Sequence, residues 1–156
     1  MARPVTHSLV KALQRVPGFD LLPDKDLLRI VGASVNLFWP AGSLVFEKDS
    51  PGEALFIVLS GRVRILDEVD GHETEIAETG PGDFFGEMSL MLETTHSKSV
   101  RVTEDAELLV LRKESFRALM AEKPDLAATI TRRLEERQAE TMARIAQTDR
   151  AAASHP

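Results

Sequence analysis

Residues 80–102 read Gly-Pro-Gly-Asp-Phe-Phe-Gly-Glu-Met-Ser-Leu-Met-Leu-Glu-Thr-Thr-His-Ser-Lys-Ser-Val-Arg-Val. The Gly-Glu-Met-Ser-Leu segment predicts a single helical turn, and unpaired backbone N–H groups at a helix start favour an anion. The carboxylate of Glu87 is better suited to accepting a hydrogen bond from a sugar hydroxyl. A β-like run at 97–102 is expected to close the other side. The stretch therefore predicts a cradle for a phosphate joined to a sugar.

This pattern resembles the phosphate-binding cassette of cyclic nucleotide-binding domains, as in the bacterial catabolite activator and the regulatory subunits of cyclic-nucleotide-dependent kinases. The matching segments are residues 85–90 and 96–102. The resemblance implies that Glu87 holds the ribose hydroxyl and that backbone amides after Gly86 hold the phosphate. It also implies an arginine about nine residues beyond Glu87, paired with the phosphate, and His96 occupies that position. The implied ligand is cAMP or cGMP, with no cofactor.

The other candidate ligand contacts follow from the same resemblance. Ser97 comes directly after the arginine position, where some relatives place a hydroxyl on the phosphate. Positions 96 and 98 point the same way along a strand, so Lys98 could bring charge to the phosphate. An ungapped match places Thr141 where catabolite-activator relatives contact adenine. The candidate ligand-binding residues are Gly86, Glu87, Met88, Ser89, His96, Ser97, Lys98 and Thr141.

His96 leaves two hypotheses open. Arginine offers a permanent charge and a two-pronged donor, whereas an unperturbed histidine is only about a quarter charged at pH 7. Losing one charged hydrogen bond costs about 1.5–3 kcal/mol, or roughly ten- to a hundredfold in affinity. Either the domain binds a cyclic nucleotide weakly and relays it through the C-terminal helix, or it is a ligand-independent protein-interaction module. If His96 faces the phosphate, affinity should rise as the pH falls from 8 to 6.

Length and composition indicate a single domain over residues 1–156. The absence of cysteine excludes disulfides, thiolate metal sites and cysteine nucleophiles. A net charge of −6 argues against a surface built for nucleic acid or anionic membranes. The N-terminus has no long apolar run, so we expect no signal peptide or membrane span, and a cytoplasmic location by default.

The predicted fold is mainly β with flanking helices. Glycines at 42, 52, 61, 71 and 80 recur every nine or ten residues, which is typical of short strands joined by turns in an antiparallel sandwich or barrel. We expect strands at 35–39, 44–47, 55–59, 62–69, 73–79, 97–102 and 107–111. The predicted architecture is an antiparallel β-barrel or jelly roll (double-stranded β-helix) over 34–112, with helices at 8–33 and 113–148 and tails at 1–5 and 149–156.

The last predicted helix begins at Pro124, which suits the first helical position, and runs to about Gln147. Its narrow apolar stripe indicates a possible homodimer through residues 124–147. The resemblance covers about residues 8–148, and the transcription-factor branch carries a helix-turn-helix beyond that point. The sequence ends there, so we expect a sensor module without DNA binding, whose protein partner is unknown.

An enzyme is the less favoured alternative. A cupin has a similar barrel but needs a His-x-His pair, and the four histidines include none. No activated serine with a base is apparent either. Haem ligation by His96, known in gas-sensing relatives, stays a minor alternative. We therefore expect no catalytic residues and no metal ligands.

Overall fold

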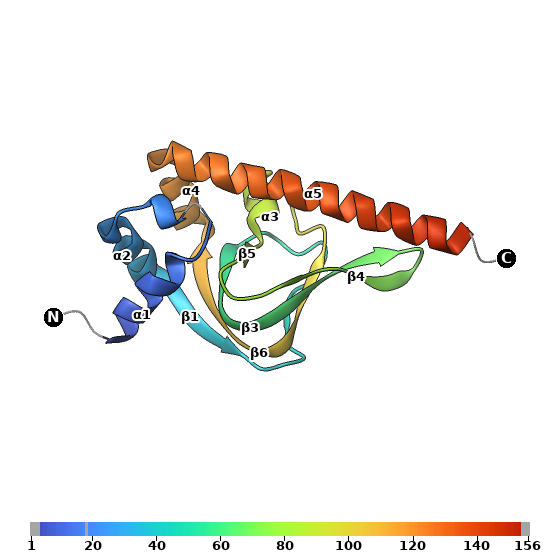
Figure 1. Ribbon diagram of the computed structural model, residues 1–156, viewed down its shortest axis with the longest axis horizontal. Coiled ribbons are helices and arrows are strands. Elements are labelled where there is room, and N and C mark those ends of the chain that lie inside the picture. The colour runs from blue at the N-terminus through green and yellow to red at the C-terminus, as the bar shows by residue number, and fades with distance from the viewer. Residues whose placement is uncertain (1–3, 18, 154–156) are drawn as a thin grey trace.

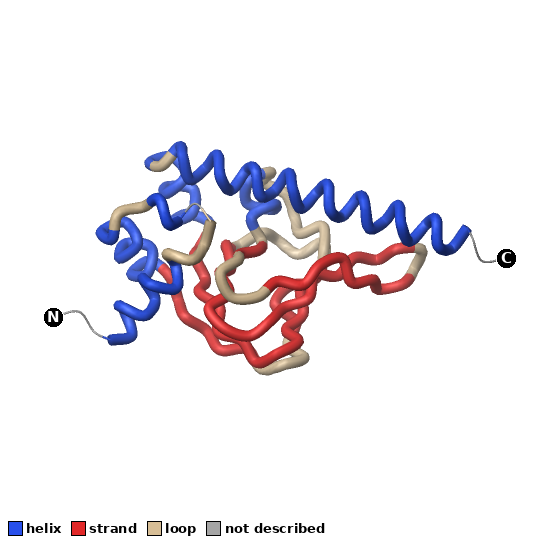
Figure 2. The backbone as a smooth tube through the Cα atoms, in the orientation of Figure 1, coloured by secondary structure: helices blue, strands red, loops and turns tan. Residues whose placement is uncertain are grey.

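The computed structural model describes residues 4–17 and 19–153. Helices cover one end of a β-sheet and one of its sides, where the last helix runs the length of the molecule (Figures 1 and 2). The helices are α1 (Pro4–Leu13), the 3-10 helix η1 (Phe19–Leu21), α2 (Asp24–Ala33), α3 (Glu87–Met91), α4 (Lys113–Glu122) and α5 (Pro124–Ala153). The strands are β1 (Ser34–Trp39), β2 (Leu44–Phe46), β3 (Ala54–Val69), β4 (His72–Thr79), β5 (Phe84–Phe85) and β6 (Ser99–Arg112).

The six strands form one antiparallel sheet. The pairing order is β1-β6-β3-β4, while β2 also pairs with β6 and β5 with β3. Within the described chain β1 and β4 do not pair with each other, so the sheet curls without closing into a full barrel. The predicted class, a mainly antiparallel β jelly roll with flanking helices, is confirmed.

In two places, a pair of segments that the sequence predicted as separate strands forms one continuous strand. Segments 55–59 and 62–69 join in β3, and 97–102 and 107–111 join in β6. The chain stays paired through Gly61 because this glycine adopts a φ of 82° at a register shift between β3 and β6. Such a bulge accommodates an extra residue without ending the strand. The predicted Asp70-Gly71 hairpin turn is present, with φ values of 53° and 78°.

The terminal helices are longer than predicted. Helix α1 begins at Pro4, and α5 continues to Ala153 rather than ending near Gln147. Parts of both expected tails are therefore helical. Helix α5 starts at Pro124, as predicted, and its residues Leu126 and Ile130 are buried in the core. The core thus holds the first two turns of this helix.

The hydrophobic core has two clusters. One lies at the helical end of the molecule, where Phe19, Phe116 and Ile130 pack against residues of β3 and β6. The other fills the inside of the sheet and includes Phe56 and Phe85, whose rings stack with centroids 5.2 Å apart. This second cluster forms the floor beneath the cassette.

A charged pair ties α2 to the start of α5. Asp26 is buried on α2, and its Oδ2 lies 2.7 Å from the Nζ of Lys123, directly before α5. The Lys123 ammonium lowers the pKa of the Asp26 carboxyl below its usual value. The N-terminal helices and the base of α5 are therefore held together. None of the described helices is long and apolar enough to cross a membrane.

Candidate functional site

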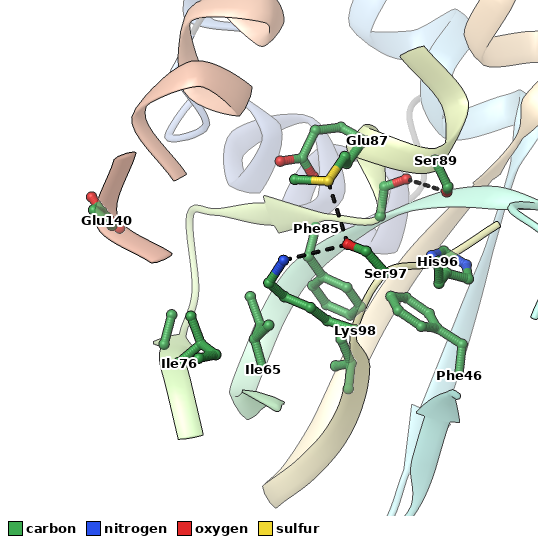
Figure 3. Close-up of a pocket in the computed structure, with 14 residues that line it drawn as sticks. Phe46, Ile65, Ile76, Phe85, Glu87, Ser89, His96, Ser97, Lys98 and Glu140 are labelled. Carbon is green, nitrogen blue, oxygen red and sulfur yellow. Dashed lines mark hydrogen bonds between the residues drawn. The ribbon is translucent and has the colours of Figure 1, made fainter. Parts of the chain in front are cut away.

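A pocket of about 70 Å³ lies between the α3 turn, strands β3 and β4, and the chain that leads into β6 (Figure 3). Seven of the eight candidate residues line it: Gly86, Glu87, Met88, Ser89, His96, Ser97 and Lys98. The eighth, Thr141, belongs to α5, but its side chain lies outside the described residues. The segments on either side of the cassette loop therefore meet, as the sequence predicted.

The turn into α3 requires glycine at its first position. Gly86 adopts a left-handed conformation (φ 88°, ψ −2°). A Cβ there would lie 3.0 Å from the carbonyl oxygen of Ala54 and 3.2 Å from the ring of Phe56. Because a side chain would meet both backbone strain and close contacts, Gly86 fixes how the following residues approach the pocket.

Ser89 holds this turn together. Its hydroxyl donates a hydrogen bond to the Gly86 carbonyl at 3.1 Å. It also packs so tightly on Gly52 that a Cβ added to Gly52 would lie 2.6 Å from the Ser89 Cβ. Ser89 is 3% exposed. Its hydroxyl proton is thus used within the protein, and the hydroxyl oxygen keeps only acceptor capacity.

Glu87 is the first residue of α3 and is 2% exposed, although it lines the pocket. A carboxylate at a helix N-terminus is stabilised by the positive end of the helix dipole. Each carboxylate oxygen accepts more than one hydrogen bond. A buried acceptor of this kind suits a ligand hydroxyl better than an anion.

His96 is held by a ring contact and by two backbone hydrogen bonds. Its imidazole stacks on Phe46, with ring centroids 3.5 Å apart and an angle of 6° between the rings. Its backbone N–H donates to the Ser50 carbonyl at 2.9 Å, and its carbonyl accepts from the Asp49 N–H at 2.7 Å. Burial lowers the pKa of His96 to about 4. At pH 7 only about one imidazole in a thousand is charged, so this ring behaves as a flat apolar wall.

The lowered pKa of His96 predicts an acid-sensitive fold. The unfolded chain regains a histidine pKa near 6.5, so the stabilisation from the neutral buried ring is complete above that value and falls as the pH drops from about 6.5 to 4. We expect the free energy of unfolding to fall by about 1–3 kcal/mol over this range. Urea denaturation of His96→Phe should show a smaller decrease, whereas His72→Gln, at an exposed position on β4, should retain it. An unchanged decrease in His96→Phe would contradict the prediction.

Ser97 and Lys98 form a polar row on the pocket wall opposite α3. The Lys98 ammonium donates to the Ser97 hydroxyl at 3.3 Å, and that hydroxyl lies 3.5 Å from the sulfur of Met88. Strand β6 begins only at Ser99, so a bend at 97–98 brings Lys98 to the pocket, not the strand alternation that the sequence suggested. Figure 3 shows the Lys98 amine and the His96 ring on opposite sides of Ser97.

The sequence did not single out the remaining lining residues. The apolar wall comes from five strands and consists of Phe46, Ile65, Ile76, Ala77, Phe85 and Val100. Helix α5 contributes Glu140. Glu140 lies 3.8 Å from Arg133, which also bonds Asp83 at 3.0 Å in the turn before β5. The only available signal for Glu140 was its position next to Thr141.

The described residues contain no cluster of three or more histidine and carboxylate groups that could hold a metal ion. The pocket combines a polar side, formed by Glu87, Ser97 and Lys98, with an apolar wall. Comparison with known proteins agrees with this geometry. The sequence profile of the cyclic nucleotide-binding domain matches residues 37–123. The chain belongs to this family.

Relatives of this cyclic nucleotide-binding domain include a longer bacterial protein. The cyclic AMP receptor protein of Thermus thermophilus is 42% identical over 103 residues, which are 63% of this chain and 48% of that protein. This chain thus spans about half the length of that relative. The resemblance inferred from the cassette is confirmed at the level of the family.

Solved structures of two relatives have the same fold. The Thermus thermophilus catabolite activator protein superposes with a TM-score of 0.73 and 32% identity, over 85% of this chain and 63% of that one. The regulatory domain of Toxoplasma gondii protein kinase A, crystallised with cAMP, gives 0.74 and 26%, over 86% and 50%.

Proposed function

We propose that this domain is a regulatory module that senses cAMP or cGMP, binds it weakly and relays its presence through α5. The observation that carries the proposal is the pocket itself, where buried Glu87, the Gly86 turn and the 96–98 segment converge. Glu87 accepts the ribose hydroxyl, and backbone amides of the α3 turn face the phosphate. We assign no catalytic role and place the protein in the cytoplasm.

The relay follows from the position of α5 at the pocket. Glu140 on this helix lines the pocket together with the cassette residues. A nucleotide that occupies the pocket would therefore contact α5. The core residues of α5 among those whose burial is described are Leu126 and Ile130 in its first turns, whereas Glu140 is exposed. The later turns are therefore the part expected to move. Ligand binding would then change the position of α5.

Isothermal titration calorimetry with cAMP, cGMP, adenosine and guanosine tests the proposal directly. We expect saturable binding of at least one cyclic nucleotide, weakened roughly ten- to a hundredfold by the missing arginine. The neutral, buried state of His96 favours a second candidate, a ligand-independent protein-interaction module. The absence of binding heat with all four compounds would support that alternative and reject the sensor.

We expect a homodimer through α5. Met142 is 72% exposed on this helix, beyond the buried Leu126 and Ile130. Met142 belongs to the narrow apolar stripe over residues 124–147, and a stripe left partly exposed in a monomer favours a two-fold helix pair. Light scattering at micromolar concentration should give about twice the chain mass, and Met142→Glu should lower it to one chain. A parent protein that stays monomeric at high concentration would contradict the dimer.

A further inference from the structure

If a cyclic nucleotide binds in this pocket, as proposed above, its phosphate needs a cationic partner that the cassette pattern does not supply. Its phosphate carries a permanent negative charge, and an anion removed from water needs a cationic partner. The described lining residues include two carboxylates, Glu87 and Glu140, and only two basic side chains, His96 and Lys98. Among the described lining residues these two are the candidates to balance the phosphate charge, beside the backbone amides of the α3 turn.

His96 is poorly placed for this task. Its ring is 5% exposed and stacks face to face on Phe46. Both backbone hydrogen-bonding groups of the residue are fixed by the turn at 49–50. Moving the imidazole toward a phosphate would break the stacking and charge a ring that burial keeps neutral. Its contacts fit a packing residue better than an anion ligand.

Lys98 has the opposite properties. Its side chain is half-buried at the pocket wall, and its ammonium donates to the Ser97 hydroxyl. No carboxylate within the described chain lies within ion-pair distance of this ammonium, whereas Lys48 and Lys123 each have an aspartate partner. The Ser97 hydroxyl in turn contacts Met88 on the α3 turn. The unpaired charge is therefore held beside the segment that faces the phosphate.

We propose that Lys98 supplies the phosphate-binding charge of this domain, displaced by two residues from the position where the family carries arginine, and that Ser97 positions its ammonium group. A lysine is a compact point charge rather than a two-pronged donor. The assignment therefore gives selectivity for a phosphate-bearing ligand over the corresponding nucleoside, without the geometric fit of arginine. His96 remains as the apolar wall beside it.

The test compares each cyclic nucleotide with its own nucleoside, cAMP with adenosine and cGMP with guanosine, by calorimetry. The ratio of the two affinities isolates the contribution of the phosphate. We expect Lys98→Met to weaken cyclic nucleotide binding about tenfold and to leave nucleoside binding within about twofold, while Lys98→Arg preserves the ratio. His96→Gln should change the affinities for the cyclic nucleotide and the nucleoside by the same factor. Lys25→Met removes the same charge from α2 and should leave both affinities unchanged.

The outcomes separate this assignment from the proposed function. If Lys98→Met leaves the ratio of affinities unchanged, or if His96→Gln alone removes it, Lys98 is not the phosphate partner and the sensor function still stands. If the parent binds a nucleoside as tightly as its cyclic nucleotide, the phosphate has no partner and the assignment also fails. If the parent binds none of the four compounds, both proposals fail.

Discussion

Gly61→Ala is expected to lower the free energy of unfolding by about 3–5 kcal/mol. Gly61 has a φ of 82° in the bulge of β3. A Cβ at this position would overlap the Asp105 carbonyl and lie 2.6 Å from the Cα of Ala106, both in the backbone of β6. Backbone atoms of a paired strand cannot move aside as a flexible side chain can. At 2–4 °C per kcal/mol for a chain of this size, the midpoint of thermal unfolding should fall by about 10 °C.

Gly71→Ala is the matched control for this prediction. Gly71 has a similar φ of 78° in the β3–β4 hairpin, but a Cβ there would meet nothing within 4 Å. Its replacement should therefore show only the left-handed backbone cost of about 1–2 kcal/mol. Equal destabilisation of the two variants in urea or thermal denaturation would show that the contact with β6 has no effect of its own.

Glu87→Gln is expected to weaken cyclic nucleotide binding by roughly ten- to a hundredfold, the range for one hydrogen bond to a charged group. The free hydroxyl of a 3′,5′-cyclic nucleotide is the 2′-OH, which would donate to the buried Glu87 carboxylate. Glutamine keeps the size of the side chain and removes its charge. Calorimetry measures the change, and Glu68→Gln, at an exposed position of β3, removes the same charge away from the pocket.

A ligand-side variant makes the Glu87 prediction specific. The 2′-deoxy cyclic nucleotide should bind the parent as weakly as Glu87→Gln binds the normal ligand. Glu87→Gln should bind the 2′-deoxy ligand almost as well as the parent does, because the two changes remove the same hydrogen bond. If the affinity losses from the protein change and the ligand change instead add fully, Glu87 and the 2′-OH do not interact.

Much of the fold could be predicted because the glycines and local patterns specify it. The Asp70-Gly71 turn and the Pro124 helix start are local features, and both are present. Gly61 misled the strand prediction because a glycine in an apolar run indicates a turn or a bulge equally well. Only its pairing with β6, more than 40 residues later, decides between them.

Seven residues that line the pocket could be proposed from the sequence, but their environment and the other lining residues could not. The cassette pattern places Gly86, Glu87 and His96 together from sequence alone. The state of His96 depends on Phe46, which is 50 positions earlier and carries no signal of that contact. Glu140 could not be found because the face that α5 turns to the pocket is set by the burial of Leu126 and Ile130. Ligand contacts of the predicted residues remain a prediction.

In the proposed relay, helix α5 would pivot about its buried first turns, with a short anchored part and a long free part. Leu126 and Ile130 hold it in the core, and Arg133 fastens it to Asp83 in the turn before β5. The 20 residues that follow Arg133, up to Ala153, extend about 30 Å at 1.5 Å per residue. A tilt of about 10° at Arg133 therefore displaces the far end by about 5 Å, roughly one helical turn. Glu140 lies about 10 Å from Arg133 along the helix, so in the proposed relay a shift of about 2 Å at Glu140 would become about 5 Å at Ala153. A second protein or a second copy of α5 could detect a movement of that size.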